Sequence, residues 1–169
     1  MMTIFEAILP DQINEVRKLM RAFIEWHRVR HHAEADLLDS YFDPVKYEAE
    51  LDGLPGKFAQ PRGRLLLATY DGEAAGCVAL HDLGEGACEM KRMFVYPEFH
   101  GKGIGRALVE AIINEAKYIA YTKMLLDTGA KQFEAQGLYH SVGFQNIPAY
   151  YELPDDMRDW LVFMELKLQ

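Results

Sequence analysis

The segment with the clearest capacity for chemistry is residues 95–106, which reads Val-Tyr-Pro-Glu-Phe-His-Gly-Lys-Gly-Ile-Gly-Arg. Because they lack Cβ atoms, Gly101, Gly103 and Gly105 let the backbone bend tightly and bring its N–H groups close to a ligand. A helix is expected to begin at Ile104, and its first amides and its dipole favour an anion. The segment therefore predicts a phosphate or diphosphate site.

The spacing of these glycines differs from that of two common nucleotide-binding loops. A Rossmann fingerprint reads Gly-x-Gly-x-x-Gly, and a P-loop has four residues between its first glycine and a Gly-Lys-Ser/Thr end. Neither spacing is present in the segment. Alternating glycines also occur in loops that bind nothing, and the loop alone leaves that alternative open.

The charge of the chain favours one small anionic ligand over a polyanion. A net charge of -8 over 169 residues argues against a nucleic-acid partner, which requires clustered Lys and Arg. Between residues 91 and 106 the single acid Glu98 stands among four basic residues: Lys91, Arg92, Lys102 and Arg106. Either a site for one anion or a solvated face of salt bridges explains this basic island.

The composition also indicates the cellular compartment and whether a metal site is expected. No apolar run approaches the roughly 20 residues that cross a bilayer, and Glu6 stands where a signal peptide carries basic residues. We therefore expect a cytoplasmic chain with no membrane partner. Cys77 and Cys88 have no His or Cys at metal-ligand spacing, so buried, reduced thiols are expected and a metal site is not.

Hydrophobic periodicity predicts the elements that position the glycine segment. Strands are expected at about residues 3–8, 65–70, 74–81, 87–95, 124–127, 144–151 and 160–168. Helices are expected at about residues 13–30, 104–119 and 131–142, with a shorter one after the cap Asp43-Pro44 in a poorly ordered region, 31–61. Turns are expected at Asp71-Gly72 and at residues 82–86. This order indicates one domain, residues 1–169, of mixed α/β (α+β) class with helix, sheet and helix layers.

Two separated motifs give the chain a resemblance to a known family. His100, Gly103 and Gly105 occupy the positions of Gln/Arg-x-x-Gly-x-Gly/Ala, the acetyl-coenzyme A loop of the GNAT superfamily of N-acetyltransferases. Residues 89–95 look like the family's fourth strand, and residues 135–144 look like its Ala-x-x-Leu-Tyr and Gly-Phe signature. The resemblance covers residues 65–168 well and the first 60 residues only in the order of elements.

The resemblance implies a fold and a donor. It implies a mixed, mostly antiparallel central sheet of six to seven strands with helices on both faces, and acetyl-coenzyme A as co-substrate. The donor would lie against the main chain of Met93, Phe94 and Val95. The implied diphosphate contacts are Gly101, Lys102, Gly103, Ile104, Gly105 and Arg106. His100 replaces the usual Arg or Gln, and Gln132 stands where many relatives have Asn beside the pantetheine.

The resemblance also implies two catalytic groups. An amine acceptor arrives protonated, since a lysine-like amine has a pKa near about 10.4, and Glu89 matches the family's glutamate that acts as general base, directly or through water. Tyr139 matches the tyrosine that protonates the leaving thiolate. The alternatives are an exposed strand carboxylate for Glu89 and an aromatic core residue for Tyr139.

The resemblance implies a small-molecule or peptide amine as acceptor, and it places the end of the first helix over the acceptor cleft. Trp26, Arg30 and Tyr150 are the candidate contacts, with a preference for cationic amines as a hypothesis. Surface histidines and packing tyrosines are the alternative. Two other functions stay open, a silent coenzyme A-binding module and a transferase of longer acyl chains. The apolar strand at residues 160–168 either completes the sheet or pairs across a homodimer.

Overall fold

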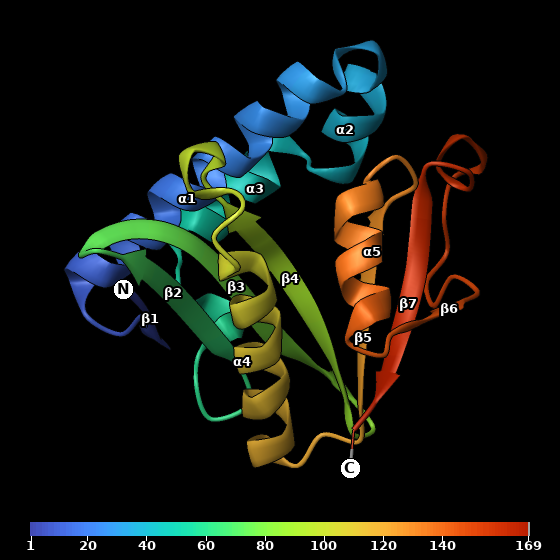
Figure 1. Ribbon diagram of the computed structural model, residues 1–169. Helices are drawn as coiled ribbons and strands as arrows, with labels where there is room; N and C mark the ends of the chain where they lie inside the picture. Colours follow the sequence, from blue (N-terminus) through green and yellow to red (C-terminus); the bar gives the residue numbers. More distant parts are fainter. Residues whose placement is uncertain (169) are drawn as a thin grey trace.

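The computed structural model describes residues 1–168, which form one seven-stranded sheet with helices on both faces (Figure 1). The strands are β1 (Met2–Glu6), β2 (Arg64–Tyr70), β3 (Glu73–Gly84), β4 (Ala87–Val95), β5 (Lys123–Gly129), β6 (Gln145–Ile147) and β7 (Leu161–Lys167). The helices are α1 (Pro10–Arg30), α2 (Ala35–Tyr41), α3 (Pro44–Asp52), α4 (Ile104–Ile119) and α5 (Phe133–Ser141). The strand order is β1-β2-β3-β4-β5-β7-β6, and every pair is antiparallel except β4 and β5. The predicted sheet is confirmed.

The hairpins follow local turn chemistry. Asp71 and Gly72 join β2 to β3 with φ of 50° and 85°, the conformation for which an Asp-Gly turn is suited. The second turn lies later than predicted. β3 continues to Gly84, with a register irregularity between Asp82 and Gly84, where the Asp82 side chain accepts a hydrogen bond from the Gly84 amide at 2.8 Å. The chain reverses at Glu85 and Gly86 instead.

Two predicted regions differ from the structure. The region 31–61 contains α2 as well as the expected α3, whose cap Asp43 accepts hydrogen bonds from the amides of Val45 and Lys46. α2 has only 7 residues and no side-chain cap, so it lacks the usual sequence signals of a helix start. β6 ends at Ile147 rather than near residue 151, because Pro148 has no N–H to donate to the ladder.

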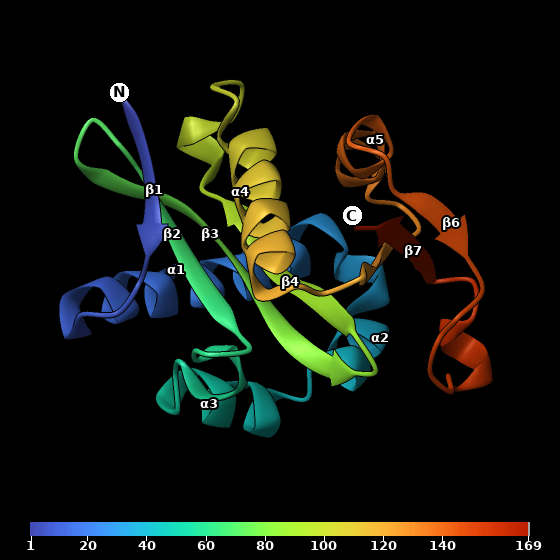
Figure 2. The same cartoon turned by 90° about the horizontal axis from the view of Figure 1, so that it is seen from below.

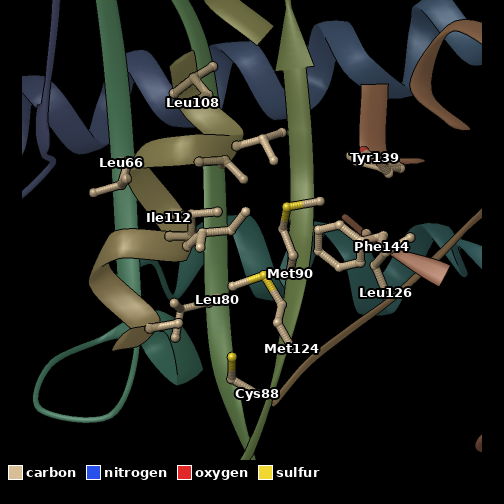
Figure 3. Packing of buried hydrophobic residues seen from close by; sticks show 14 of the residues in the cluster. Leu66, Leu80, Cys88, Met90, Leu108, Ile112, Met124, Leu126, Tyr139 and Phe144 are labelled. Atoms are coloured by element: carbon tan, nitrogen blue, oxygen red, sulfur yellow. The ribbon is translucent and has the colours of Figure 1, made fainter. Parts of the chain in front are cut away.

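The two faces of the sheet carry separate cores. α4 and α5 lie on one side and α1, α2 and α3 on the other (Figure 2). On the first side, Leu108 and Ile112 of α4 pack over Met90 of β4 (Figure 3). On the second, α1 buries its apolar stripe: Val16, Leu19 and Met20. Cys77 and Cys88 are buried free thiols, and burial raises the pKa of each to about 12.

The sheet opens between β4 and β5 (Figure 1). These parallel strands pair only over Ala87–Glu89 and Lys123–Leu125, and beyond that point they separate. β4 also carries a bulge, since its register with β3 shifts between Cys77 and Ala79 and Arg92 adopts φ of 60°. The bulge re-aims the end of β4 along the opening.

The structure bears on two sequence predictions: the pairing of the last strand and the absence of a membrane-spanning segment. β7 lies between β5 and β6, so it completes the sheet of its own chain, as the first of the two alternatives had it. Across residues 1–168, no helix has the length and apolar character needed to span a membrane.

Candidate active site

A cavity of about 480 Å³ occupies the opening between β4 and β5. Its walls come from both sides of the sheet: the end of α1, α2, β4 after Glu89, β5 from Leu126 to Gly129, the glycine segment and α5. The predicted site residues on its wall are Trp26, Arg30, Met93, Phe94, Val95, His100, Gly101, Gly103, Ile104, Gly105, Gln132 and Tyr139. Four others do not line it: Glu89, Lys102, Arg106 and Tyr150.

The glycine segment forms one rim of the cavity at the start of α4. Gly101 and Gly103 have φ of 81° and 79°, a left-handed conformation that costs other L-residues roughly 1–2 kcal/mol. Gly103 is the N-cap residue and carries no side chain, so the first amides of α4 have no side-chain cap. An anion in the cavity would meet these donors and the positive end of the α4 dipole.

His100 braces this loop from within. Its Nε2 lies 3.0 Å from the carbonyl oxygen of Val95, so in this tautomer the imidazole donates to the end of β4. The side chain therefore holds the loop against the strand. The backbone donors of the loop do not depend on this side chain.

The four residues of the basic island are dispersed. Lys102 extends over the ring of Tyr70, with Nζ 5.0 Å from the ring centroid. Arg106 bonds Glu110 at 3.3 Å and the Ser141 hydroxyl at 3.1 Å. Lys91 and Arg92, which line the cavity, are paired with the carboxylates of Glu89 and Glu50. Three of the four are in ion pairs and Lys102 lies over an aromatic ring, so the island does not form one anion patch.

Tyr139 of α5 (Figure 3) is one of the residues that line the cavity. The residue is buried, and its ring centroid is 5.8 Å from that of Phe144. Burial, and then the charge of Asp127, raise the pKa of Tyr139 well above its ordinary value. The hydroxyl therefore keeps its proton at neutral pH.

Glu89 is enclosed in a hydrogen-bonded group behind the cavity wall. Its Oε1 is 2.7 Å from His81 Nε2, and its Oε2 accepts from the Tyr150 hydroxyl at 2.5 Å. Lys91 Nζ is 3.7 Å from Oε1. Burial opposes ionisation, but the His81 bond, the Lys91 charge and the Tyr150 bond together lower the pKa of Glu89 to about 2. Glu89 is a poor proton acceptor in this setting.

The low pKa of Glu89 predicts a pH-dependent contribution to stability. Its pKa falls from 4.5 to about 2 on folding, so the contribution is complete above pH 4.5 and is lost as pH falls toward 2. Its size is about 3 kcal/mol. Glu89→Gln should lower the free energy of unfolding by that order at pH 7, and the deficit should shrink at pH 3. Urea unfolding at both pH values measures it. The exposed Asp156→Asn is the control, and a deficit equal at both pH values contradicts the prediction.

Gln132 connects α5 to the end of α1. Its amide nitrogen is 3.1 Å from His27 Nδ1 and 2.6 Å from His31 Nε2. Burial, then His31 and Arg30, lower the pKa of His27 to about 4, and burial is also the main cause that lowers the pKa of His31. Both rings are therefore neutral at pH 7 and accept from the amide.

The predicted acceptor residues are divided between two places. Trp26 and Arg30 lie on the cavity wall, with the Arg30 guanidinium 4.9 Å from the Trp26 ring. Arg30 also forms an ion pair with Glu134 of α5 at 2.9 Å. Tyr150 instead bonds Glu89. The structure thus brings two of the three acceptor candidates to the cavity.

A polar group missed by the sequence reasoning lies deep on the β5 wall. The Asp127 carboxylate accepts from the hydroxyl groups of Tyr41 and Tyr151, and Lys91 Nζ lies 3.7 Å from it. Asp127 lies within β5 directly after the buried apolar run of residues 124–126, and this position is the signal that could have found it. Tyr41 belongs to the unpredicted α2. Among residues 1–168, no group of three His, Cys, Asp or Glu is placed to hold a metal ion.

Comparison with known proteins places this geometry in a family. Residues 22–144 match the profile of the acetyltransferase (GNAT) family. An uncharacterized N-acetyltransferase of Schizosaccharomyces pombe is 34% identical over 148 residues, which cover 86% of this chain and 84% of that protein. The chain therefore belongs to the GNAT acetyltransferase family.

Solved structures share the whole fold. An acyl-CoA N-acyltransferase of Klebsiella pneumoniae superimposes with a TM-score of 0.74 at 27% identity, over 100% of this chain and 99% of that one. The PaiA N-acetyltransferase of Thermoplasma acidophilum, solved in complex with coenzyme A, gives a TM-score of 0.72 at 15% identity and covers 99% of both chains. The second likeness is one of fold alone.

Proposed function

We propose that this chain moves an acetyl group from acetyl-coenzyme A to a primary amine of a small molecule or peptide. As a member of the GNAT acetyltransferase family, it is an acetyltransferase with acetyl-coenzyme A as donor. The observation that carries the acceptor side is the cavity between β4 and β5, which runs from the glycine rim to buried polar groups. The relatives' names, N-acetyltransferase and N-acyltransferase, support nitrogen as the acceptor atom.

The donor is proposed to lie along the opening with its diphosphate on the glycine rim. Gly101, Gly103 and Gly105 line the cavity, and the free amides at the start of α4 supply donors to the phosphate oxygens. Lys102 and Arg106 are close in sequence but hold other partners, so they contribute charge rather than direct contact. The pantetheine then follows Met93, Phe94 and Val95 into the cavity.

The reaction is proposed to proceed by direct attack within a ternary complex. The amine nitrogen attacks the thioester carbonyl, and a main-chain N–H near the β4 bulge stabilises the oxyanion, an effect worth roughly 3 kcal/mol in a dry, preorganised site. Collapse breaks the C–S bond, and Tyr139 gives its proton to the thiolate. The hydroxyl suits this role by its position on the cavity wall, although its raised pKa makes it a weaker acid than an exposed tyrosine.

Release of free thiol from acetyl-coenzyme A in the presence of a panel of cationic, neutral and anionic amines tests the proposal. Turnover with any amine supports it. Donor binding without turnover for every amine would instead favour the silent coenzyme A-binding module. Comparison of acetyl-, propionyl- and succinyl-coenzyme A in the same assay separates acetyl transfer from transfer of longer chains.

Removing the Tyr139 hydroxyl should slow the release of thiolate. We expect Tyr139→Phe to lower kcat roughly 10- to 30-fold, because general acid catalysis is lost while the ring and its packing remain. The affinity for acetyl-coenzyme A, measured by calorimetry, should stay within about twofold. Tyr118→Phe, at an exposed position of α4, is the matched control. An unchanged kcat would remove the assignment.

A further inference from the structure

We propose that Asp127 is a catalytic residue that binds the acceptor's ammonium group and takes up its proton. This inference rests on the proposed function, because it concerns the acceptor end of the same cavity. The ammonium must lose a proton before it attacks, and a carboxylate that the amine can reach in the cavity can take that proton. Glu89, which the sequence suggests for this task, does not line the cavity, whereas Asp127 does.

The position of Asp127 follows from the opening of the sheet. Leu125 is the last residue of β5 that pairs with β4, and Asp127 comes two residues later, where the strands have separated. Alternation along the strand puts the two residues on one face. The Asp127 side chain is only 6% exposed, yet it lines the cavity. Its carboxylate is therefore shielded from bulk water and accessible from the cavity, where a charge interacts strongly.

The partners of Asp127 suit a group that receives a cation. Oδ1 accepts from the Tyr41 hydroxyl and Oδ2 from the Tyr151 hydroxyl. These two donors fix the orientation of the carboxylate. Lys91 Nζ is 3.7 Å from Oδ2, beyond hydrogen-bonding distance, and it donates instead to Tyr41 at 3.3 Å. A carboxylate has about four acceptor sites, so the two tyrosine bonds leave capacity for an amine.

The contrast with Glu89 favours Asp127. One oxygen of Glu89 is hydrogen-bonded to His81 and the other to Tyr150, and Lys91 lies beside the carboxylate. Asp127 likewise has two donors and Lys91 at 3.7 Å, so the difference between the two carboxylates is access: Asp127 lines the cavity and Glu89 does not. Glu89 instead holds Lys91 and Tyr150 in place around the Asp127 group.

The step balances in protons and electrons. An N–H proton of the ammonium moves to Asp127, and the freed nitrogen lone pair forms the C–N bond. The carbonyl π electrons move to oxygen and then return as the C–S bond breaks. Tyr139 protonates the thiolate and recovers a proton, through water, from the second N–H of the attacking nitrogen. Asp127 finally releases its proton to solvent, which leaves amide, free thiol and one proton.

Thiol release by Asp127→Asn, with an amine that the wild type acetylates, tests the assignment. We expect kcat to fall about 100-fold or more, within the range for general base catalysis, with acetyl-coenzyme A affinity within about threefold. Glu115→Gln, which removes an ion-paired carboxylate from α4 remote from the cavity, is the control and should keep full activity. A tenth or more of the wild-type kcat in Asp127→Asn would overturn the inference while leaving the proposed function intact.

A second readout separates proton transfer from a structural role. An amine that is already neutral at pH 7, such as an alkoxyamine, needs no deprotonation before attack. We expect the Asp127→Asn loss to shrink to less than tenfold with it. Equal losses for both amines would make Asp127 structural and overturn the inference. Tyr41→Phe, which keeps the carboxylate but removes one bond to it, should lower kcat about tenfold with the basic amine. It covers the case in which Asp127→Asn does not fold.

Discussion

Gly103→Val should lower the affinity for acetyl-coenzyme A about 100-fold, or about 3 kcal/mol, in a protein that still folds. The residue has φ of 79°, which a β-branched side chain resists. No protein atom lies within 4 Å of a Cβ built there, so the new side chain would extend into the space above the rim. The substitution would change the direction of the first α4 amides, and it would reduce the space for a diphosphate. Calorimetric titration with acetyl-coenzyme A measures the change.

Gly72→Val provides a matched control for the strain. Gly72 has φ of 85° in the β2–β3 hairpin, and it too has no atom within 4 Å of an added Cβ. The two variants should lose similar free energy of unfolding, on the order of 1–2 kcal/mol. Only the variant at the glycine rim should lose donor affinity. An equal fall in affinity in both, or none in either, would contradict the proposed diphosphate site.

Gly76→Val should cost about 4 kcal/mol of unfolding free energy. Gly76 lies in β3 opposite Val95, and a Cβ there would lie 2.8 Å from the Phe94 carbonyl oxygen and 3.0 Å from Leu108 Cδ1. The first contact is with backbone, so no rotamer change relieves it. β4 would be pushed from β3 just where it lines the cavity. Urea unfolding measures the loss, and activity should fall with it.

Gly137→Ala is the corresponding control on α5. Nothing lies within 4 Å of an added Cβ there, and alanine favours a helix interior by roughly 0.5–1 kcal/mol over glycine. This variant should therefore be slightly more stable than the wild type. A loss for Gly76→Val no larger than that of an ordinary surface substitution would refute the close approach of β3 to β4 and α4.

The sequence predicts elements well where the signal is local. The Asp71-Gly72 turn, the Asp43 cap and the glycine segment each work through neighbouring backbone groups, and the structure places all three as expected. α2 was missed because it is short and uncapped. β6 is shorter than predicted because Pro148, which has no N–H, ends the strand within an apolar pattern that continues beyond it.

The site was only partly predictable for a different reason. The part of the site proposed for the donor could be predicted, because main-chain groups form it and their geometry follows from the glycine and strand positions. The acceptor side depends on which side chains meet across the opening. Asp127 of β5 and Tyr41 of α2 lie 86 positions apart in the sequence, and no periodicity reveals such a pair. Likewise, the bond from Tyr150 to Glu89 that draws both away from the cavity is tertiary and leaves no mark in the sequence.

Because the β4–β5 pairing is short, β5, β6 and β7 form a part of the sheet that is hydrogen-bonded to the other strands at one end only. Ladder contact with the rest of the sheet is limited to three residues on each strand, reinforced at that end by the Thr122 amide on the Gly86 carbonyl at 2.8 Å. Amide hydrogens of β5, β6 and β7 should therefore exchange with solvent through a shared opening that leaves β1 to β3 intact. A donor bound between β4 and β5 contacts both parts of the sheet. Its binding free energy therefore adds to the free energy needed to open them.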